Sequence, residues 1–292
     1  MKMSKLPLHP SLSHFLLLAT QSSCISEALT CVALLSAENL FLQPHRDADK
    51  ALAVQAHKVF ASRDGDLCTM INIYNAWVEA KRNPDWTRQR FLSMRALKLA
   101  SNIRNQLFTL LQTLDMNGLD KSCWPEREPF LKCLAQGFYL HIAQKVVVVK
   151  EQYAGPKAGK VVYGAGGQQA KGGQKREPLA GIQQIMSIGG RRNESLLGNI
   201  TAPYETLRGH QPVHIHPSSV LFQLSSKQLP QCVVYAELLT TTKQYMRNVS
   251  VVEASWLAEL MPHVFSQNQA APHSQPSRQE EGAGRVSSQW LQ

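Results

Sequence analysis

The sequence predicts an α+β fold in which a helical block precedes a small antiparallel barrel. Across residues 23–144, apolar residues recur with the 3.6-residue period of helices. Beyond residue 145 the pattern changes to short runs that alternate in polarity or are rich in β-branched residues, as strands are. Helices followed by strands are typical of α+β or two-domain proteins. With 292 residues, of which 43% are hydrophobic, the chain is long enough for two domains.

Four helices are predicted within the helical block. Asp66 is expected to cap a helix whose apolar residues share one face, and Asn83-Pro84 joins a capping residue to a proline at the first helical position. A long helix is expected over residues 93–114 and another over residues 128–144. The apolar stripe of the long helix consists of Leu97, Ala100, Ile103, Leu107, Leu110, Leu111 and Leu114.

The opposite side of the long helix is polar. This side carries Arg95, Lys98, Asn102, Asn105, Gln106 and Thr109, and such a face is by itself typical of a solvated helix surface. Arg104 lies at the edge of the apolar stripe, where two interpretations stay open. Its guanidinium either reaches outward to water or is paired within the fold.

The strand-rich part predicts the barrel. Strands are expected at residues 145–150, 204–207, 213–216, 220–223, 232–240 and 245–252, with a closing helix over residues 253–260. Residues 155–200, between the first two strands, hold eleven of the seventeen glycines and seven Lys or Arg against two Glu. We therefore expect a mobile basic loop there. The polar residues 266–292, punctuated by Pro and Gly, predict a disordered tail.

The composition limits the class of partner and the compartment. The formal charge of +10, from 31 basic and 21 acidic side chains, favours a polyanion: nucleic acid first, anionic lipid second. The six cysteines form no CxxC pair, and scattered thiols indicate reduced, buried side chains. The apolar run at residues 15–19 is too short for a signal peptide, and no run is long enough to span a membrane. We expect a soluble intracellular protein.

Two ligand-binding motifs are weighed and set aside. The segment GPKAGK, which begins at Gly155, lacks the spacing of a phosphate-binding loop, and Val161 stands where Ser or Thr is required. His210, His214 and His216 lie close in sequence, but the sequence indicates neither a complete ligand set nor a shielded pocket. A metal site is therefore disfavoured. No nucleophile–base pair is recognisable either.

The segment VHIHPSSVLF, residues 213–222, poses a more specific question. Apolar and polar residues alternate up to His216, and then Pro217 and two serines interrupt the strand pattern. Pro217 fixes a bend, and the hydroxyls of Ser218 and Ser219 are able to donate to backbone groups or to a phosphate. A purely structural corner, in which the serines bond their own backbone, stays open as the alternative.

This corner and the residues after it resemble the C-terminal barrel of the DEAH-box RNA helicases. In that family an HPSS or HPAS corner is followed by V-[VI]-Y-x-E, by T-[TS]-K-x-Y-[MI]-R and by a Trp-Leu pair. The matching residues here are 234–237, 242–247 and 256–257. CISEALTCVALLS and GDLCTMINIYNAW in the helical block resemble further family motifs. The resemblance covers residues 6–265 without the glycine-rich insert, although Leu67 and Thr87 replace a His and a Cys of the family pattern.

The resemblance implies a division into domains. Residues 1–22 would be the end of a winged-helix domain, 23–136 a ratchet-like helicase-associated domain, and 137–265 an OB-fold barrel with a disordered insert at 154–202, before the tail 266–292. The two ATPase domains of the family precede this region, and the chain contains no Walker loop or DEAH box. We therefore expect this chain to hold no cofactor and not to hydrolyse ATP alone, while intact family enzymes use ATP and magnesium.

The resemblance also implies a function. The chain would grip single-stranded RNA within a helicase for RNA processing, such as splicing or ribosome biogenesis, in the nucleus or nucleolus, with the cytoplasm as the alternative. The implied contacts to phosphate and sugar are Arg95, Lys98 and Asn102 on the long helix and His216, Ser218, Ser219 and Lys243 on the barrel. Two other hypotheses stay open: a stand-alone RNA-binding module, and a protein-interaction module whose barrel docks a glycine-rich activator protein.

Overall fold

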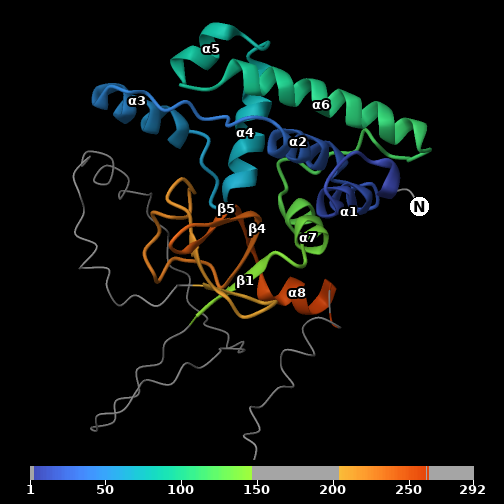
Figure 1. Ribbon diagram of the computed structural model, residues 1–292. Coiled ribbons are helices and arrows are strands. Elements are labelled where there is room, and N and C mark those ends of the chain that lie inside the picture. The colour runs from blue at the N-terminus through green and yellow to red at the C-terminus, as the bar shows by residue number, and fades with distance from the viewer. Residues whose placement is uncertain (1–2, 147–203, 261, 263–292) are drawn as a thin grey trace, which may run out of the picture.

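The computed structural model describes residues 3–146, 204–260 and 262, and within these ranges helices precede strands (Figure 1). The helical part consists of the short η1 (Met3–Lys5), α1 (Pro10–Ala19), α2 (Ile25–Ser36), α3 (Asp47–Lys58), α4 (Asp66–Glu79), α5 (Pro84–Gln89), α6 (Met94–Thr113) and α7 (Glu128–Gly137). The strands are β1 (Ile142–Lys145), β2 (Tyr204–Thr206), β3 (Pro212–Ile215), β4 (Cys232–Thr240) and β5 (Gln244–Val252), and α8 (Ala254–Leu260) follows them. The predicted α+β order is confirmed.

The five strands close into a barrel in the order β1-β2-β3-β5-β4. The pairs are antiparallel except β3 with β5, which run parallel with His214 opposite Tyr245. The barrel is therefore mainly, and not entirely, antiparallel. Its interior is filled by Ala143, Tyr204, Val213, Ile215, Leu221, Val233, Tyr235, Met246 and Val249.

Strand β4 joins the barrel to the helical part. At the start of this strand both faces are buried, one in each part. Val233 and Tyr235 point into the barrel, whereas Cys232 and Val234 belong to the core of the helical part. Side chains alternate along a strand, so one strand supplies two cores. The second half of β4, from Glu237 to Thr240, is exposed.

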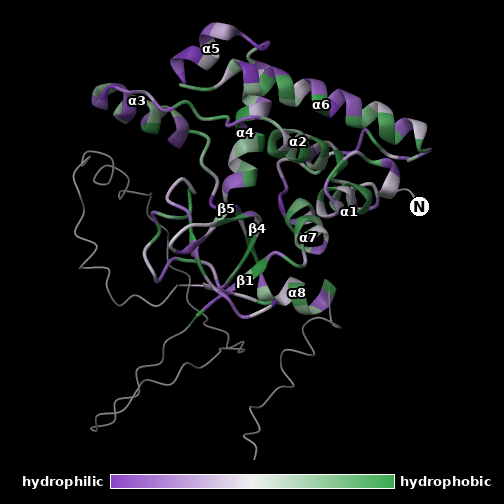
Figure 2. Ribbon diagram, in the orientation of Figure 1, coloured by the Kyte–Doolittle hydropathy of each residue, from purple (hydrophilic) through white to green (hydrophobic). Residues whose placement is uncertain are grey.

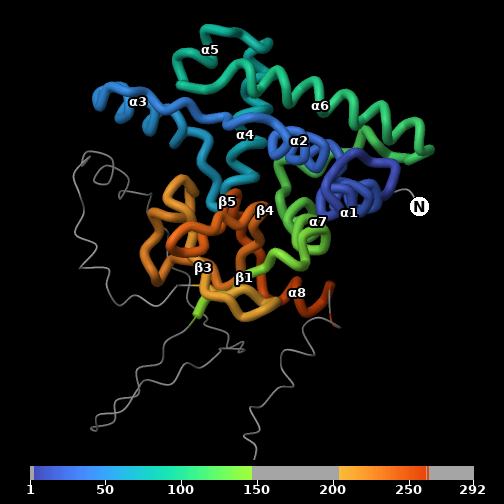
Figure 3. Tube along the Cα trace, viewed as in Figure 1, coloured from blue at the N-terminus to red at the C-terminus, as the bar shows by residue number. Residues whose placement is uncertain are grey.

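The helical core forms around α2, and Figure 2 shows this helix as hydrophobic along most of its length. From Ile25 to Leu34 every described residue of α2 except Ser26 is buried. The first and last helices of this part also meet: α1 lies beside α7 (Figure 3), and the ring of Phe15 packs edge-on against those of Phe130 and Phe138. Segments more than a hundred residues apart thus close the same core.

The long helix α6 agrees closely with its prediction. Ser93 caps it, because the Ser93 hydroxyl accepts a hydrogen bond from the Ala96 amide at 3.1 Å. Its buried side consists of Ala96, Leu97, Ala100, Ser101, Leu107 and Leu111, and it packs on α2. The Asn83-Pro84 start of α5 is also confirmed, with the Asn83 side chain accepting from the Asp85 amide at 2.8 Å.

Two helix predictions are corrected. Asp66 does not cap α4; Gly65 occupies the capping position and Asp66 is the first helical residue. The helix expected over residues 128–144 ends at Gly137, after which a turn bonds the amide of His141 to the carbonyl of Phe138. The residues beyond this turn pair as β1 with β2 and β4.

The strand expected at residues 220–223 is also wrong. This segment forms turns, in which the Phe222 amide bonds the Ser219 carbonyl and the Leu224 amide bonds the Leu221 carbonyl. Local backbone bonds of this kind remove the donors and acceptors that a ladder needs. Most of the strand expected at residues 145–150, the GPKAGK segment, the glycine-rich insert and the tail lie outside the described residues.

The six cysteines are free, and the prediction that they are buried is confirmed for all but Cys123, which is partly exposed. Among the helices that the structure describes, none has the length and apolar character needed to cross a membrane.

Candidate nucleic-acid interface

The corner at residues 216–219 forms at the end of β3. The His216 amide bonds the Met246 carbonyl of β5 at 2.9 Å, which extends the parallel pairing by one residue. After Pro217 the chain turns, and the Ser219 amide bonds back to the His216 carbonyl at 3.0 Å. The two serines of the corner then point to different surroundings.

Ser218 is exposed and lies against the histidine ring. The Oγ of Ser218 is 2.7 Å from Nδ1 of His216, and the Ser218 amide donates to the same nitrogen at 3.2 Å. This ring nitrogen is therefore an acceptor for the amide.

Ser219 is only 4% exposed. Its hydroxyl donates to Oδ1 of Asp66 at 3.0 Å and accepts from the Leu221 amide at 3.2 Å. Both hydrogen-bonding roles of the hydroxyl are thus used inside the protein. The hydroxyl is not accessible to a phosphate, so we leave Ser219 out of the predicted RNA contacts.

Asp66 connects the helical part to the barrel. Its carboxylate accepts from the Val220 amide at 2.8 Å, from the Ser219 hydroxyl and, through Oδ2, from the Val249 amide of β5 at 2.8 Å. Burial raises the pKa of Asp66 to about 6, against the opposing effect of these hydrogen bonds. The side chain expected to cap a helix thus ties that helix to the corner and to β5.

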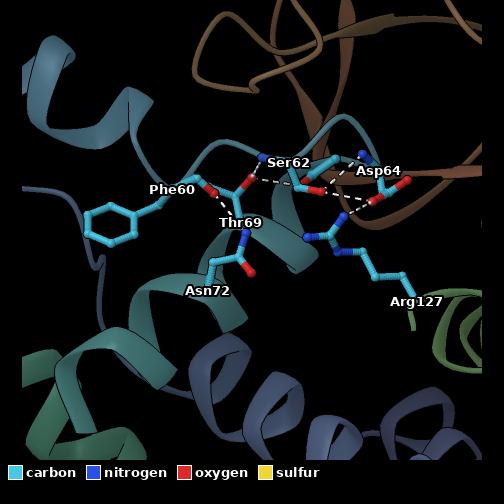
Figure 4. Close-up of polar contacts among 7 residues, drawn as sticks. Phe60, Ser62, Asp64, Thr69, Asn72 and Arg127 are labelled. Atoms are coloured by element: carbon cyan, nitrogen blue, oxygen red, sulfur yellow. Dashed lines mark hydrogen bonds and ion pairs between the residues drawn. The ribbon is translucent and has the colours of Figure 1, made fainter. Parts of the chain in front are cut away.

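The residues just before Asp66 strengthen this connection, and Figure 4 shows their polar contacts. Oδ2 of Asp64 accepts from the Ser62 hydroxyl at 2.9 Å and from Arg127 at 3.1 Å, while the Asp64 carbonyl accepts from the Val251 amide at 2.9 Å. We call residues 62–66 the junction segment, because it binds α4, the approach to α7 and strand β5 together.

Gly65 lets the junction segment approach β5 closely. Its φ is +110°, and a Cβ on this residue would lie 2.3 Å from the Val249 carbonyl oxygen and 2.7 Å from the Ser250 Cα. Backbone atoms cannot yield as a flexible side chain does, so this position requires glycine. The Gly-Asp pair of the sequence therefore has a packing role as well as a hydrogen-bonding one.

The outer face of β3 and β5 brings aromatic and basic side chains together. His214 and His216 alternate with the buried Val213 and Ile215 and point outward. Their rings lie 5.8 and 5.9 Å from that of Tyr245. We call these three rings the aromatic face; Lys243 and Arg247 flank it.

Electrostatics keep the two imidazoles neutral at neutral pH. Burial lowers the pKa of His214, and the charge of Lys243 lowers it further. Burial likewise lowers the pKa of His216, with a smaller contribution from Arg247. The positive charge at this face therefore resides on Lys243 and Arg247, of which Arg247 is paired at 3.4 Å with the exposed Glu237.

The structure brings together some of the residues predicted to contact RNA and separates others. His216, Ser218 and Lys243 lie at the barrel. Arg95, Lys98 and Asn102 are exposed on α6, which lies on the other side of α2 and α4 in Figure 1. Of these, Arg95 is paired with Glu38 at 3.0 Å. The prediction therefore describes two separate surfaces.

The RNA contacts predicted from the sequence did not include His214, Tyr245 or Arg247. The outward direction of Tyr245 and Arg247 could have been predicted, since they alternate along the strand with the buried Met246. The pairing of β5 with β3 could not have been predicted, because parallel strands far apart in sequence leave no local pattern. His210, once weighed as a metal ligand, is paired with Glu205 at 2.9 Å, and no group of three metal-ligating side chains is found in the described part of the chain.

Comparisons with known proteins agree with this architecture. Residues 9–70 match the family model for the helicase-associated domain (HA2), ratchet-like, and residues 130–264 match that for the oligonucleotide/oligosaccharide-binding (OB) fold. The chain is 27% identical over 267 residues to a probable ATP-dependent RNA helicase of Homo sapiens, DHX35, covering 91% of this chain and 29% of the relative.

Two further relatives have similar coverage. The pre-mRNA-splicing factor ATP-dependent RNA helicase DEAH10 of Arabidopsis thaliana is 28% identical over 278 residues, covering 90% of this chain and 30% of the relative. The ATP-dependent RNA helicase DHX33 of Mus musculus is 29% identical, covering 90% of this chain and 29% of the relative.

These matches identify the two domains of the chain and its relatives. The chain contains a ratchet-like helicase-associated domain and an OB-fold, and it is homologous to the C-terminal part of the DEAH-box RNA helicases. It spans about 30% of the length of the curated relatives described above.

Proposed function

We propose that this chain binds single-stranded RNA and serves as the RNA-gripping accessory region of a DEAH-box helicase. The observation that carries the proposal is the aromatic face of the barrel. The rings of His214 and His216 each lie within 6 Å of the Tyr245 ring, on an outward surface that Lys243 and Arg247 flank.

This combination suits a single strand better than a duplex. Unpaired bases stack on aromatic rings whatever their sequence, and cations beside the rings attract the backbone. The net charge of +10 adds a general attraction for polyanions. We infer contacts to bases by stacking and to phosphates by Lys243, with little readout of sequence.

The helicase context supports the same proposal. ATP hydrolysis, magnesium and strand separation would belong to the rest of such a helicase. Because the relative DEAH10 is named a pre-mRNA-splicing factor, we extend the proposal to a role in RNA processing. The nuclear location that the family resemblance implies is part of this proposed role. Docking of a glycine-rich activator protein stays a prediction.

The test is a binding titration of the full chain with a fluorescently labelled 12-nucleotide oligo(U), followed by anisotropy at several salt concentrations. Tyr245→Ala should weaken binding by roughly 5- to 150-fold, because stacking of one base on an aromatic ring contributes about 1–3 kcal/mol. The matched control is Tyr139→Ala, at a tyrosine that is 39% exposed on the link between α7 and β1.

The salt dependence supplies a second readout. The logarithm of the binding constant should fall with the logarithm of salt concentration with a slope of about −0.7 for each phosphate contacted. Wild-type protein that binds no oligo(U) at low salt, or a Tyr245→Ala variant that binds as tightly as Tyr139→Ala, would refute the proposed function.

A further inference from the structure

A second polar site lies away from the barrel, in a groove between α2, α4 and α6. The groove has a volume of about 330 Å³, within the range of small-ligand sites. It is lined by Ser26, Thr30, Tyr74, Asn75, Val78, Glu79, Arg82, Arg104 and Asn105. We call it the arginine groove, because its lining includes two arginines, Arg82 and Arg104.

Arg104 is the central group of the arginine groove. It is half-buried, and its Nε donates to the Thr30 hydroxyl at 3.0 Å while its Nη2 donates to the Ser26 hydroxyl at 3.1 Å. Of the two interpretations open from the sequence, pairing within the fold is therefore correct. Both partners are neutral hydroxyls on adjacent turns of α2, so they orient the guanidinium without neutralising its charge.

An oriented, partly buried arginine without a carboxylate partner in the described part of the chain is unusual. Charged groups removed from water are normally paired with an opposite charge. A guanidinium has five N–H donors, and the two hydroxyls use two of them. The remaining donors of Arg104 are available to an anion that enters the groove.

Arg82 reaches the same groove from the end of α4. Lys81 and Arg82 have φ values of 53° and 57°, a conformation that side-chain-bearing residues adopt rarely. The two successive left-handed residues turn the chain back after α4, and the Arg82 guanidinium then lies 5.6 Å from the centroid of the Trp77 ring. Backbone strain of this kind is found preferentially at functional sites.

The neighbouring amides complete the donor set. Asn75 and Asn105 line the groove, and side-chain amides bind phosphate and sugar oxygens. Asn105 also follows Asn102 by three residues on α6, so it lies next to the exposed face of Lys98 and Asn102. The polar face predicted from the sequence therefore leads into the arginine groove.

We propose that the arginine groove binds a phosphate ester, with Arg104 and Arg82 as donors to its oxygens. The phosphate belongs either to the backbone of the single-stranded RNA of the proposed function or to a free nucleotide. The RNA case rests on the proposed function. The planar guanidinium is well matched to this ligand, because it donates two parallel hydrogen bonds to phosphate oxygens.

The experiment uses Asn105→Asp, which places a negative charge at the groove on an exposed helix position and leaves both arginines in place. The matched control is Gln112→Glu, an equal change of charge at an exposed position two turns further along α6 and outside the groove. Circular dichroism melts confirm that both variants fold. Affinities for 12-nucleotide oligo(U) and for uridine monophosphate are then measured with the full chain.

For an RNA phosphate, Asn105→Asp should weaken oligo(U) binding about 5- to 10-fold and reduce the salt slope by about 0.7, the loss of one phosphate contact. Gln112→Glu should stay within twofold of wild type. For a free nucleotide, uridine monophosphate binds wild type and Gln112→Glu, and Asn105→Asp abolishes this binding. Either pattern supports the groove.

The proposal is overturned if Asn105→Asp and Gln112→Glu bind both ligands equally. The proposed function would then survive provided that Tyr245→Ala still weakens oligo(U) binding, so the two failures are distinguishable. An Arg104→Met variant gives a second check. It removes the guanidinium, and it should lower affinity for the same ligand that Asn105→Asp affects; unchanged affinity in a folded Arg104→Met variant also overturns the proposal.

Discussion

Replacing Ser219 by alanine separates a structural role of the corner from a role in RNA binding. The substitution removes one hydroxyl from a buried site and leaves the backbone turn intact. Asp66 then loses a donor that lies 3.0 Å away, and the buried Leu221 amide loses its acceptor at 3.2 Å. Water does not replace the lost hydroxyl as donor to Asp66 or as acceptor for Leu221, because the site is only 4% exposed.

The expected loss of stability follows from these two contacts. A hydrogen bond to a charged group contributes about 1.5–3 kcal/mol, and a buried amide left unpaired costs about 1–3 kcal/mol. The effects share one hydroxyl and are not fully additive. We expect Ser219→Ala to lower the free energy of unfolding by about 2–4 kcal/mol.

The assay is urea denaturation of the full chain, followed by circular dichroism and tryptophan fluorescence. Ser218→Ala is the matched control, since Ser218 is exposed and bonds His216 within the described part of the chain; its change should stay within about 0.5 kcal/mol. Below the unfolding transition, Ser219→Ala should bind oligo(U) within twofold of wild type. A variant of unchanged stability, or a folded variant with weakened RNA binding, would refute this reasoning.

Two other predictions concern the junction segment. Gly65→Ala should destabilise the chain by more than about 3 kcal/mol, because its Cβ would lie 2.3 Å from the Val249 carbonyl and the residue has a φ of +110°; a melt within 2 °C of wild type would contradict this. The pKa of Asp66 is raised from 3.8 to about 6, so its stabilising contribution is present below pH 3.8 and is lost as the pH rises through 6. Between pH 4 and 6.5 the unfolding free energy of wild type should therefore fall by about 2 kcal/mol relative to Asp66→Asn. The opposite trend would mean that the hydrogen bonds to Asp66 outweigh its burial.

The sequence was most informative where local pattern and tertiary role coincide. The stripe of α6 and the Asn83-Pro84 start of α5 follow directly from helix periodicity and capping, and the structure agrees with both. The helix α3 gave no such signal because only Ala53 is buried along it. A helix with so few buried positions has no apolar stripe to reveal it.

The corner and the junction segment could not be resolved from the sequence for a different reason. Asp66 has the residue type and position of a helix cap, but its three donors come from residues more than 150 positions away in the chain. The choice between local capping and tertiary bonding depends on which segments meet in the fold. The same holds for Arg104, whose hydroxyl partners lie 74 and 78 positions away.

Helix α4 connects the two surfaces proposed to bind RNA. Its first residue, Asp66, bonds β5 of the barrel, and its last residue, Glu79, lines the arginine groove. With 14 residues and a rise of about 1.5 Å each, the helix holds these ends about 21 Å apart. One RNA strand that engages both surfaces should gain affinity from the raised effective concentration of its second site.

This geometry predicts a dependence on oligonucleotide length. A trinucleotide, at about 3.4 Å per stacked nucleotide, is too short to bridge the two surfaces, whereas a 12-nucleotide strand is long enough. Asn105→Asp should therefore weaken binding of the long oligo(U), measured by competition against a labelled strand, and leave binding of the trinucleotide to the aromatic face unchanged. An equal loss for both lengths would mean that the groove and the barrel do not act on one strand, and that α4 does not set the spacing between them.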